Sequence, residues 1–156
     1  MEQDIEKLLE GKHIEYQLIK LTENAYTVDD VMRYSEGKVN ADEICKTIIL
    51  RGKKTGKKLA ILLRGNDRVD FSAAKKLFGE EMTVANQEEV REAAGVEPGA
   101  VCPFLLKVPL FVDRKVLDLK RINCGSGDHL CGLEFETKDL AKGVNYDTVD
   151  LSRTSP

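Results

Sequence analysis

The chain has 156 residues, of which 42% are hydrophobic and 33% are charged, and its formal net charge is -3. This composition is typical of a globular domain with a densely charged surface, and we expect a single domain over residues 1–156. The charge excludes a protein that is basic overall, although a local basic patch could still contact phosphates. No apolar run reaches about 18 residues and the start lacks a signal-peptide pattern, so we expect a cytoplasmic protein that does not interact with membranes.

Apolar periodicity and capping residues predict short helices and strands along the chain. Thr27 and Asn86 are suitable N-caps, and Ser72 is the expected N-cap of a third helix. Gly79 and Gly95 are expected at helix ends. The expected helices cover residues 4–9, 28–34, 73–78, 87–94 and 138–141. The expected strands cover residues 14–18, 44–51, 58–64, 82–85, 110–113, 120–124, 133–136 and 148–151.

The spacing of these elements predicts the fold class. Helices and strands interleave, but many links between strands are too short for the crossover that parallel strands require. The sequence therefore predicts an α/β fold of the α+β type, with a mixed, largely antiparallel sheet and helices packed on it. No repeat, low-complexity tract or linker divides the chain.

The strand at 44–51 carries one lysine, Lys46, shortly before the apolar run 48–50. A lysine in this setting either points to water or lies in a cleft where its ammonium meets an anion. A solvent-facing lysine is the simpler interpretation of the pattern alone.

Strands 44–51 and 58–64 are joined by the polar, glycine-bearing segment 52–57, which is typical of a β-hairpin. Four lysines gather in this turn: Lys53, Lys54, Lys57 and Lys58. The simpler interpretation is a solvated turn that resists aggregation. The functional alternative is a contact with a phosphate backbone.

Two segments rich in glycine could serve a ligand. The first runs from Gly95 to Pro103, and its Pro98-Gly99 pair favours a type II turn. The second, Gly125-Ser126-Gly127, lies between two predicted strands and could present backbone N–H groups to an anion or a carbonyl oxygen. Tight turns use the same residues without any ligand, so the pattern leaves both interpretations open.

Motifs for phosphate loops and dinucleotide sites are missing from the sequence, and neither His13 nor His129 lies in a recognisable catalytic triad. The four cysteines are Cys45, Cys102, Cys124 and Cys131. They form no CxxC pair, and we expect free thiols. Cys124, His129 and Cys131 are close enough to suggest a zinc site, but the usual paired spacing is missing, so we expect no metal and no cofactor.

Taken in order, the motifs resemble the YbaK / prolyl-tRNA-synthetase-associated domain, a family that removes wrong amino acids from tRNA. The resemblance covers nearly the whole chain. It depends on the strand with Lys46-Thr47, the following hairpin, the segment Gly95–Phe104, the run Gly125–Gly127 and the helix start at Lys138–Leu140. Each motif alone is weak, whereas the ordered set is fairly specific.

The resemblance implies a compact α/β domain with a central barrel-like sheet. It also implies hydrolysis of the ester bond between a mischarged amino acid and the terminal adenosine of tRNA. No synthetase catalytic domain is present in this sequence, so we expect a free-standing, trans-acting deacylase for substrates such as Ala- or Cys-tRNA(Pro). The expected partners are the aminoacylated 3′ end of tRNA and, as a second candidate, an aminoacyl-tRNA synthetase.

The resemblance also assigns residues. Lys46, Gly125, Ser126 and Gly127 are the expected catalytic group, with Lys46 holding a phosphate or polarising the ester and backbone N–H groups stabilising the oxyanion. The expected substrate-binding residues are Thr47, Gly95, Pro98, Gly99 and Pro103. The expected tRNA-binding residues are the hairpin lysines Lys53, Lys54, Lys57 and Lys58.

Two points leave alternatives open. The branch of the family that acts on cysteinyl-tRNA carries an acidic residue shortly after the glycine run, where this sequence has Gly132, with Asp128 as an offset substitute. The same fold could also serve a non-catalytic module that binds tRNA or a synthetase, because a fold does not determine a function.

Overall fold

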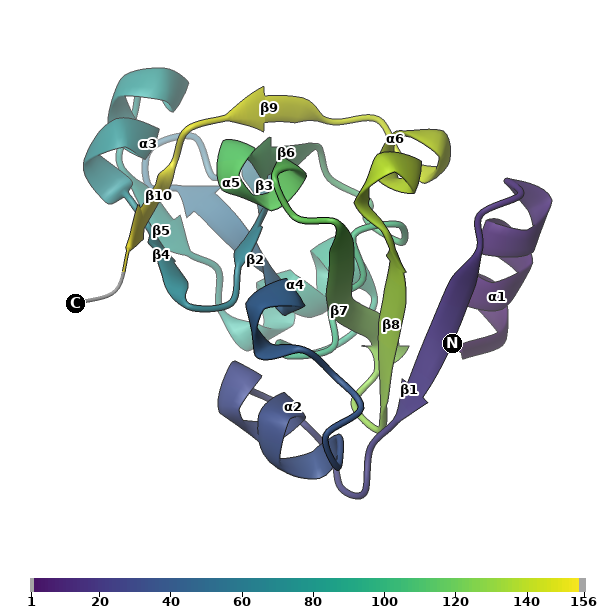
Figure 1. The fold of residues 1–156 in the computed structure, drawn as a ribbon. Helices are drawn as coiled ribbons and strands as arrows, with labels where there is room; N and C mark the ends of the chain where they lie inside the picture. Colours follow the sequence, from purple (N-terminus) through teal and green to yellow (C-terminus); the bar gives the residue numbers. More distant parts are fainter. Residues whose placement is uncertain (1, 155–156) are drawn as a thin grey trace.

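The computed structural model describes residues 2–154, with side chains from residue 4 onward. Figure 1 shows the arrangement of its helices and strands. The helices are α1 (Glu2–Gly11), α2 (Val28–Tyr34), η1 (Ala41–Glu43), α3 (Phe71–Phe78), α4 (Gln87–Ala94), α5 (Arg114–Leu117), η2 (Thr137–Asp139) and α6 (Leu140–Gly143). The strands are β1 (Tyr16–Lys20), β2 (Cys45–Gly52), β3 (Lys58–Arg64), β4 (Asp67–Val69), β5 (Met82–Val84), β6 (Leu110–Asp113), β7 (Arg121–Asp128), β8 (Cys131–Glu136), β9 (Asp147–Val149) and β10 (Ser152–Thr154).

These strands form three sheets, with the orders β1-β8-β7, β10-β4 and β5-β2-β3-β6-β9. Only the β3–β6 and β6–β9 pairs are parallel. The predicted mixed, largely antiparallel α+β fold is therefore confirmed, although its strands are divided among three sheets. A single bridge between Ile44 and Asn123 links the β2 and β7 regions of the two larger sheets. No helix between residues 2 and 154 is long and apolar enough to cross a membrane.

Strand β3 lies at the centre of the core because both of its faces are buried. Ala60 and Leu62 face the larger apolar cluster, together with Ile5 and Leu9 of α1. The alternate residues Leu59, Ile61 and Leu63 face a second cluster, which contains Ala74 of α3 and Leu151 near the C-terminus. Two buried faces explain why the sequence of this strand is a nearly continuous apolar run.

Most helix ends lie where the sequence predicts them. The hydroxyl of Thr27 accepts a hydrogen bond from the Asp30 N–H at 3.1 Å, and Asn86 forms a capping box with Glu89. Gly79 and Gly95 end their helices in the left-handed conformation. The prediction of Ser72 as an N-cap is wrong.

The N-cap of α3 is Asp70, whose Oδ1 accepts from the Ala73 N–H at 3.0 Å. The helix therefore begins at Phe71 rather than Ala73. Asp70 and Ser72 are both suitable N-caps by residue type. The path of the chain after β4 places the Asp70 carboxylate over the first turn of α3.

Three further differences lie in segments that depend on distant contacts. The first strand is shifted to Tyr16–Lys20, β4 and α5 were not predicted, and the strand predicted over 148–151 ends at Val149 as β9, with a break before the unpredicted strand β10. The buried Asp113 carboxylate explains the division. It accepts hydrogen bonds from the Leu151 N–H and the Ser152 hydroxyl, both at 2.9 Å, so the chain between β9 and β10 turns toward it.

The glycine run Gly125–Gly127 is not a loop, as the sequence suggested, but part of strand β7. The register between β7 and β8 shifts between Gly125 and Asp128, which marks a bulge. The turn of this hairpin is formed instead by His129 and Leu130.

Backbone segments approach one another closely at two of these glycines. A Cβ atom on Gly125 would collide with the Val101 carbonyl oxygen and with the backbone of Ala100. A Cβ atom on Gly99, whose φ is 99°, would lie 2.7 Å from the backbone of Tyr26. The two glycines therefore allow the segment around residues 98–101 to pack between the Tyr26 segment and β7.

We expect Gly125→Ala to lower the free energy of unfolding by about 1–3 kcal/mol, because the added methyl meets backbone that must shift. Gly132→Ala is the matched control in the neighbouring strand, since the nearest atom to its added Cβ lies at 3.8 Å. Its stability is expected to stay within about 0.5 kcal/mol of the wild type. Urea unfolding of both variants measures the difference, and equal losses in the two variants would contradict this explanation.

Candidate active site

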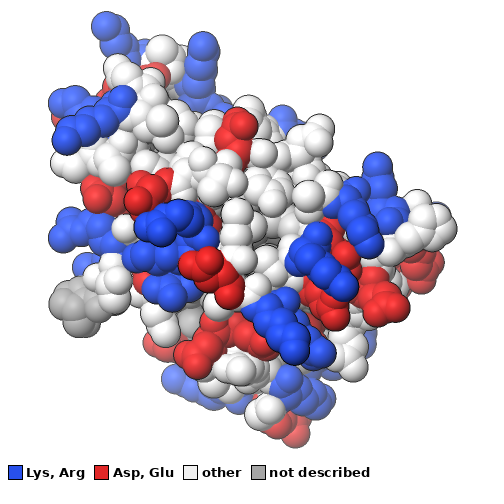
Figure 2. Space-filling model, turned by 45° about the horizontal axis from the view of Figure 1, so that its top comes forward, with Lys and Arg blue, Asp and Glu red and all other residues white. Residues whose placement is uncertain are grey.

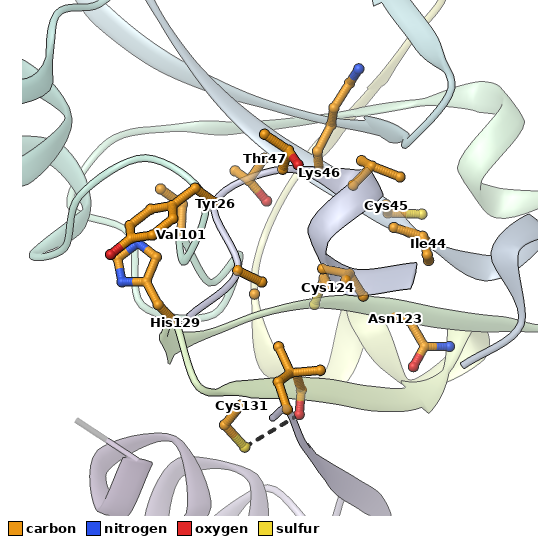
Figure 3. A pocket seen from close by; sticks show the side chains of 18 of the residues that line it. Tyr26, Ile44, Cys45, Lys46, Thr47, Val101, Asn123, Cys124, His129 and Cys131 are labelled. Atoms are coloured by element: carbon orange, nitrogen blue, oxygen red, sulfur yellow. Dashed lines mark hydrogen bonds between the residues drawn. The ribbon is translucent and has the colours of Figure 1, made fainter. Parts of the chain in front are cut away.

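A cavity of about 210 Å³ opens between the start of β2, the segment before α2, the Pro98–Val101 segment and the β7–β8 hairpin. Figure 3 shows its labelled side chains, which come from segments far apart in the sequence. Strand pairing brings two of these segments together, because the Ile44–Asn123 bridge holds the start of β2 beside β7.

Most of the cavity wall is apolar. Ile19, Val39 and Ile44 form a buried cluster at its base, and Val28 and Val31 of α2 pack against that cluster. Such a wall accepts a small apolar group and offers little to a charged one.

Three cysteines also line the cavity: Cys45, Cys124 and Cys131. Burial raises the pKa of Cys45 to about 12 and raises the pKa of Cys124 well above its usual value. Because the thiolate is the nucleophile, Cys45 and Cys124 act near neutral pH as small apolar groups rather than as reactive groups.

Two polar atoms among the cavity-lining residues are buried without a hydrogen-bond partner in the described part of the chain. They are Thr47 Oγ1 and Asn123 Oδ1. Asn123 is only 4% exposed, and its amide nitrogen lies 3.5 Å from a carboxylate oxygen of Glu43. Leaving such an atom unpaired costs about 1–3 kcal/mol, so both are unusual in a packed interior.

Lys46 lies where the cavity adjoins a second, more polar groove. The groove is lined by Thr27, Val28, Asp29, Lys46, Gly65, Asn66 and Arg68, and three of these residues also line the cavity. The Lys46 ammonium donates to the Gly65 carbonyl at 3.0 Å, which places it on the groove side. In Figure 3 its side chain extends away from the other labelled cavity residues.

The surroundings of Lys46 favour its neutral form more than water does. Partial burial lowers the pKa of Lys46, the charge of Asp67 opposes this shift, and the charge of Arg68 adds to it. An anion in the groove would stabilise the protonated ammonium.

The Pro98-Gly99 turn forms part of the rim. The His129 imidazole Nε2 lies 3.1 Å from the Pro98 carbonyl oxygen, and the His129 ring lies 4.6 Å from the exposed Tyr26 ring between centroids. These contacts tie the turn to the β7–β8 hairpin and to the segment before α2, so they fix the width of the opening.

Some residues assigned by the family resemblance lie away from the cavity. Lys46, Thr47, Pro98, Gly99 and Gly125 line it. Gly95, Pro103, Ser126 and Gly127 do not.

Each of these other four residues has a structural position. Gly95 is the C-cap of α4, and Pro103 is buried. The Ser126 hydroxyl is fully buried and donates to the Cys131 carbonyl at 2.6 Å. The Gly127 N–H donates to the Ala100 carbonyl at 2.9 Å, so this N–H already has an acceptor.

The hairpin lysines lie at the other end of β2. Seven residues separate Lys46 from Lys53, which corresponds to roughly 20 Å along a strand. Acidic residues just before β5 contact this turn, since Lys53 pairs with Glu81 at 3.5 Å and Glu80 accepts hydrogen bonds from the backbone of Lys54 and Thr55. Figure 2 likewise shows basic and acidic side chains interspersed on the face that it draws.

Sequence reasoning missed several residues that the structure brings to the site. Tyr26, Asn123 and Arg68 are the main ones. Tyr26 precedes a helix cap and Arg68 lies in a three-residue strand, so neither belongs to a pattern with a functional meaning. Asn123 lies between the apolar residues Ile122 and Cys124 of a predicted strand, which is the only local signal that it offers.

The zinc hypothesis for Cys124, His129 and Cys131 finds no support. Among residues 2–154, no group of three or more His, Cys, Asp or Glu side chains is arranged to hold a metal ion.

Comparison with known proteins matches this chain to a family and to solved structures of the same fold. The family model described as the aminoacyl-tRNA editing domain matches residues 22–142. The crystal structure of hypothetical protein APE2540 has a TM-score of 0.84 at 26% identity, covering 96% of this chain and 99% of that one. A structure described as a candidate trans-editing enzyme for prolyl-tRNA synthetase has a TM-score of 0.81 at 22% identity, covering 97% and 96%. The chain therefore belongs to the aminoacyl-tRNA editing domain family, as the order of its motifs predicted.

Proposed function

We propose that the protein hydrolyses the ester bond of a mischarged tRNA that carries a small amino acid, such as Ala- or Cys-tRNA(Pro). The observation that carries the proposal is the junction at Lys46, where a small apolar cavity adjoins a polar groove. An aminoacyl ester has the same two parts, a compact side chain on one side and a charged nucleotide on the other.

Lys46 holds the nucleotide in this proposal. Its ammonium lies on the groove side, beside Gly65, where it meets a phosphate of the terminal nucleotides. This position supports phosphate binding over polarisation of the ester. The Lys46 ammonium points away from the cavity in which the ester would lie (Figure 3). A compact ammonium suits a single phosphate oxygen.

The reaction itself needs little help, because an aminoacyl ester is already activated. Water adds to the carbonyl carbon, the bond to the ribose oxygen breaks, and a proton from the water passes to that oxygen through the neighbouring ribose hydroxyl. The products are a free amino acid and an uncharged tRNA. The high pKa values of Cys45 and Cys124 are consistent with a mechanism without a protein nucleophile.

Thr47 and Gly125 are the cavity residues best suited to the developing oxyanion. The Thr47 hydroxyl is free to donate, and Gly125 is the one residue of the glycine run whose atoms line the cavity. A well-placed donor contributes about 3 kcal/mol to such a step.

Cavity size selects the amino acid in this proposal. Gly132 leaves space beside Ile19, and no acidic side chain projects there. Asp128, the offset substitute for an acidic residue, accepts from the Leu130 N–H at 2.9 Å and so stabilises the hairpin turn. Selection by volume therefore fits the site better than recognition by a carboxylate.

Lys46→Ala is expected to reduce deacylation of the preferred mischarged tRNA by about 100-fold, since the ester loses its positioning contact. Single-turnover assays on a panel with Ala- and Cys-tRNA(Pro) measure this loss, and Lys12→Ala serves as the control for an exposed lysine. If the wild type is inert on the whole panel but binds tRNA, the proposed function is wrong and the protein is a non-catalytic binding module.

Gly132→Ala is expected to narrow the cavity by one methyl group. Deacylation of Cys-tRNA(Pro) should fall about tenfold relative to Ala-tRNA(Pro), because the larger side chain loses space. Gly11→Ala, which adds a methyl in open space at the end of α1, should leave the ratio unchanged. An unchanged ratio in Gly132→Ala would show that this wall does not contact the substrate.

The hairpin lysines remain a predicted contact for the double-stranded part of tRNA. Lys54→Glu with Lys58→Glu avoids Lys53, which pairs with Glu81, and Lys57, which lies near Glu80. The double variant should weaken tRNA binding. The slope of log binding constant against log salt concentration should also become less steep by about 0.9 for each lost phosphate contact. Equal binding of variant and wild type at low and moderate salt would reject this surface.

A further inference from the structure

The polar groove continues from Lys46 toward the short β4–β10 sheet. Arg68 of β4 lines the groove, together with Lys46 and one acidic residue, Asp29. Arg68 is exposed, and its charge contributes to the lowered pKa of Lys46, so the two cations lie close enough to interact. Two neighbouring cations along one groove favour an anionic ligand.

A third cation extends this row. Arg153 of β10 is directly opposite Arg68 in the antiparallel register, and both side chains are exposed. Residues opposite each other in such a ladder have Cβ atoms about 5 Å apart, and like charges in this position are destabilising. The empty protein therefore has an unfavourable charge pair that an anion between the two guanidinium groups would relieve.

Three of the carboxylates near these arginines already have other partners, whereas Asp29 shares the groove with Arg68. Asp67, beside Arg68 in β4, is buried and pairs with Arg64 at 2.8 Å. Asp70 caps α3, and Asp113 accepts from Leu151 and Ser152. None of these three carboxylates forms an ion pair with Arg68 or Arg153.

We propose that Lys46, Arg68 and Arg153 form a track that binds successive phosphates of a single-stranded RNA end, leading from the cavity across the groove to the edge of β10. This inference rests on the proposed function, because it assigns the last nucleotides before the ester to this track. The planar guanidinium group of arginine binds a phosphate with two parallel hydrogen bonds. This geometry suits an RNA backbone that passes along the protein surface.

The track and the hairpin lysines are separate surfaces. The track begins at the Lys46 end of β2, whereas the hairpin lies at its other end. A short single strand therefore contacts the track alone, while a whole tRNA can reach both. This difference allows the two surfaces to be tested independently.

The test measures binding of a fluorescently labelled single-stranded RNA hexamer that ends in CCA and carries no amino acid. Arg68→Gln and Arg153→Gln are each expected to weaken binding about three- to tenfold, and to reduce the salt slope by about 0.7 per arginine. Lys12→Gln makes the same change in net charge beyond the end of α1, on the opposite side of the molecule from β4 and β10, and should bind as the wild type does (Figure 1).

Thermal unfolding separates binding from a structural role. Removing one of two facing like charges should leave Tm unchanged or raise it, whereas a structural arginine would lower it. Unchanged hexamer binding in both arginine variants would overturn the track, as would a wild type that does not bind the hexamer.

Deacylation of mischarged tRNA, measured in parallel, keeps the two proposals distinct. A wild type that binds the hexamer through its arginines but hydrolyses no ester would support the track and refute the proposed function. A wild type that hydrolyses esters, with arginine variants that bind and react equally well, would refute the track and leave the proposed function standing.

Discussion

Close packing of three backbone segments determines the shape of the site. The Pro98–Val101 segment passes between the Tyr26 segment and β7, and it can do so only because Gly99 and Gly125 have no side chains. The Gly127 N–H then donates to the Ala100 carbonyl and fixes the distance between these segments. This contact helps to set the rim of the cavity, so packing alone requires glycine at both positions.

The residues assigned by the family resemblance occupy two kinds of position in this structure. Lys46, Thr47 and Gly125 reach the cavity, whereas Ser126 and Gly127 hold the bulged strand against its neighbours. The register between β7 and β8 shifts just after Gly125, and Gly125 lines the cavity whereas Ser126 and Gly127 do not. A short motif can therefore combine one residue for the ligand with others that only position it.

The start of β2 lines both the apolar cavity and the charged groove, and Lys46 belongs to both linings. Cys45 and Ile49 are buried in the core, while Lys46 lies at the surface where the sheet ends. Burial weakens the hydration of the Lys46 ammonium, and the carbonyl of Gly65 replaces only part of it. A nearby anion would therefore stabilise the protonated form of Lys46.

The sequence by itself determined the local features of this protein. Caps at Thr27 and Asn86, the left-handed glycines that end two helices, and the apolar strand β3 depend on interactions over a few residues, and they lie where the sequence predicts them. The order of motifs was also enough to place the chain in its family.

Only the tertiary structure decided which residues share the site. Asn123 and Arg68 reach it through strand pairing, and the bulge in β7 converts an apparent glycine loop into a packed strand. The division of the last strand likewise depends on Asp113, whose partners Leu151 and Ser152 lie far along the chain. Contacts between distant segments have no local signature, because the residues that make them are compatible with many other neighbours.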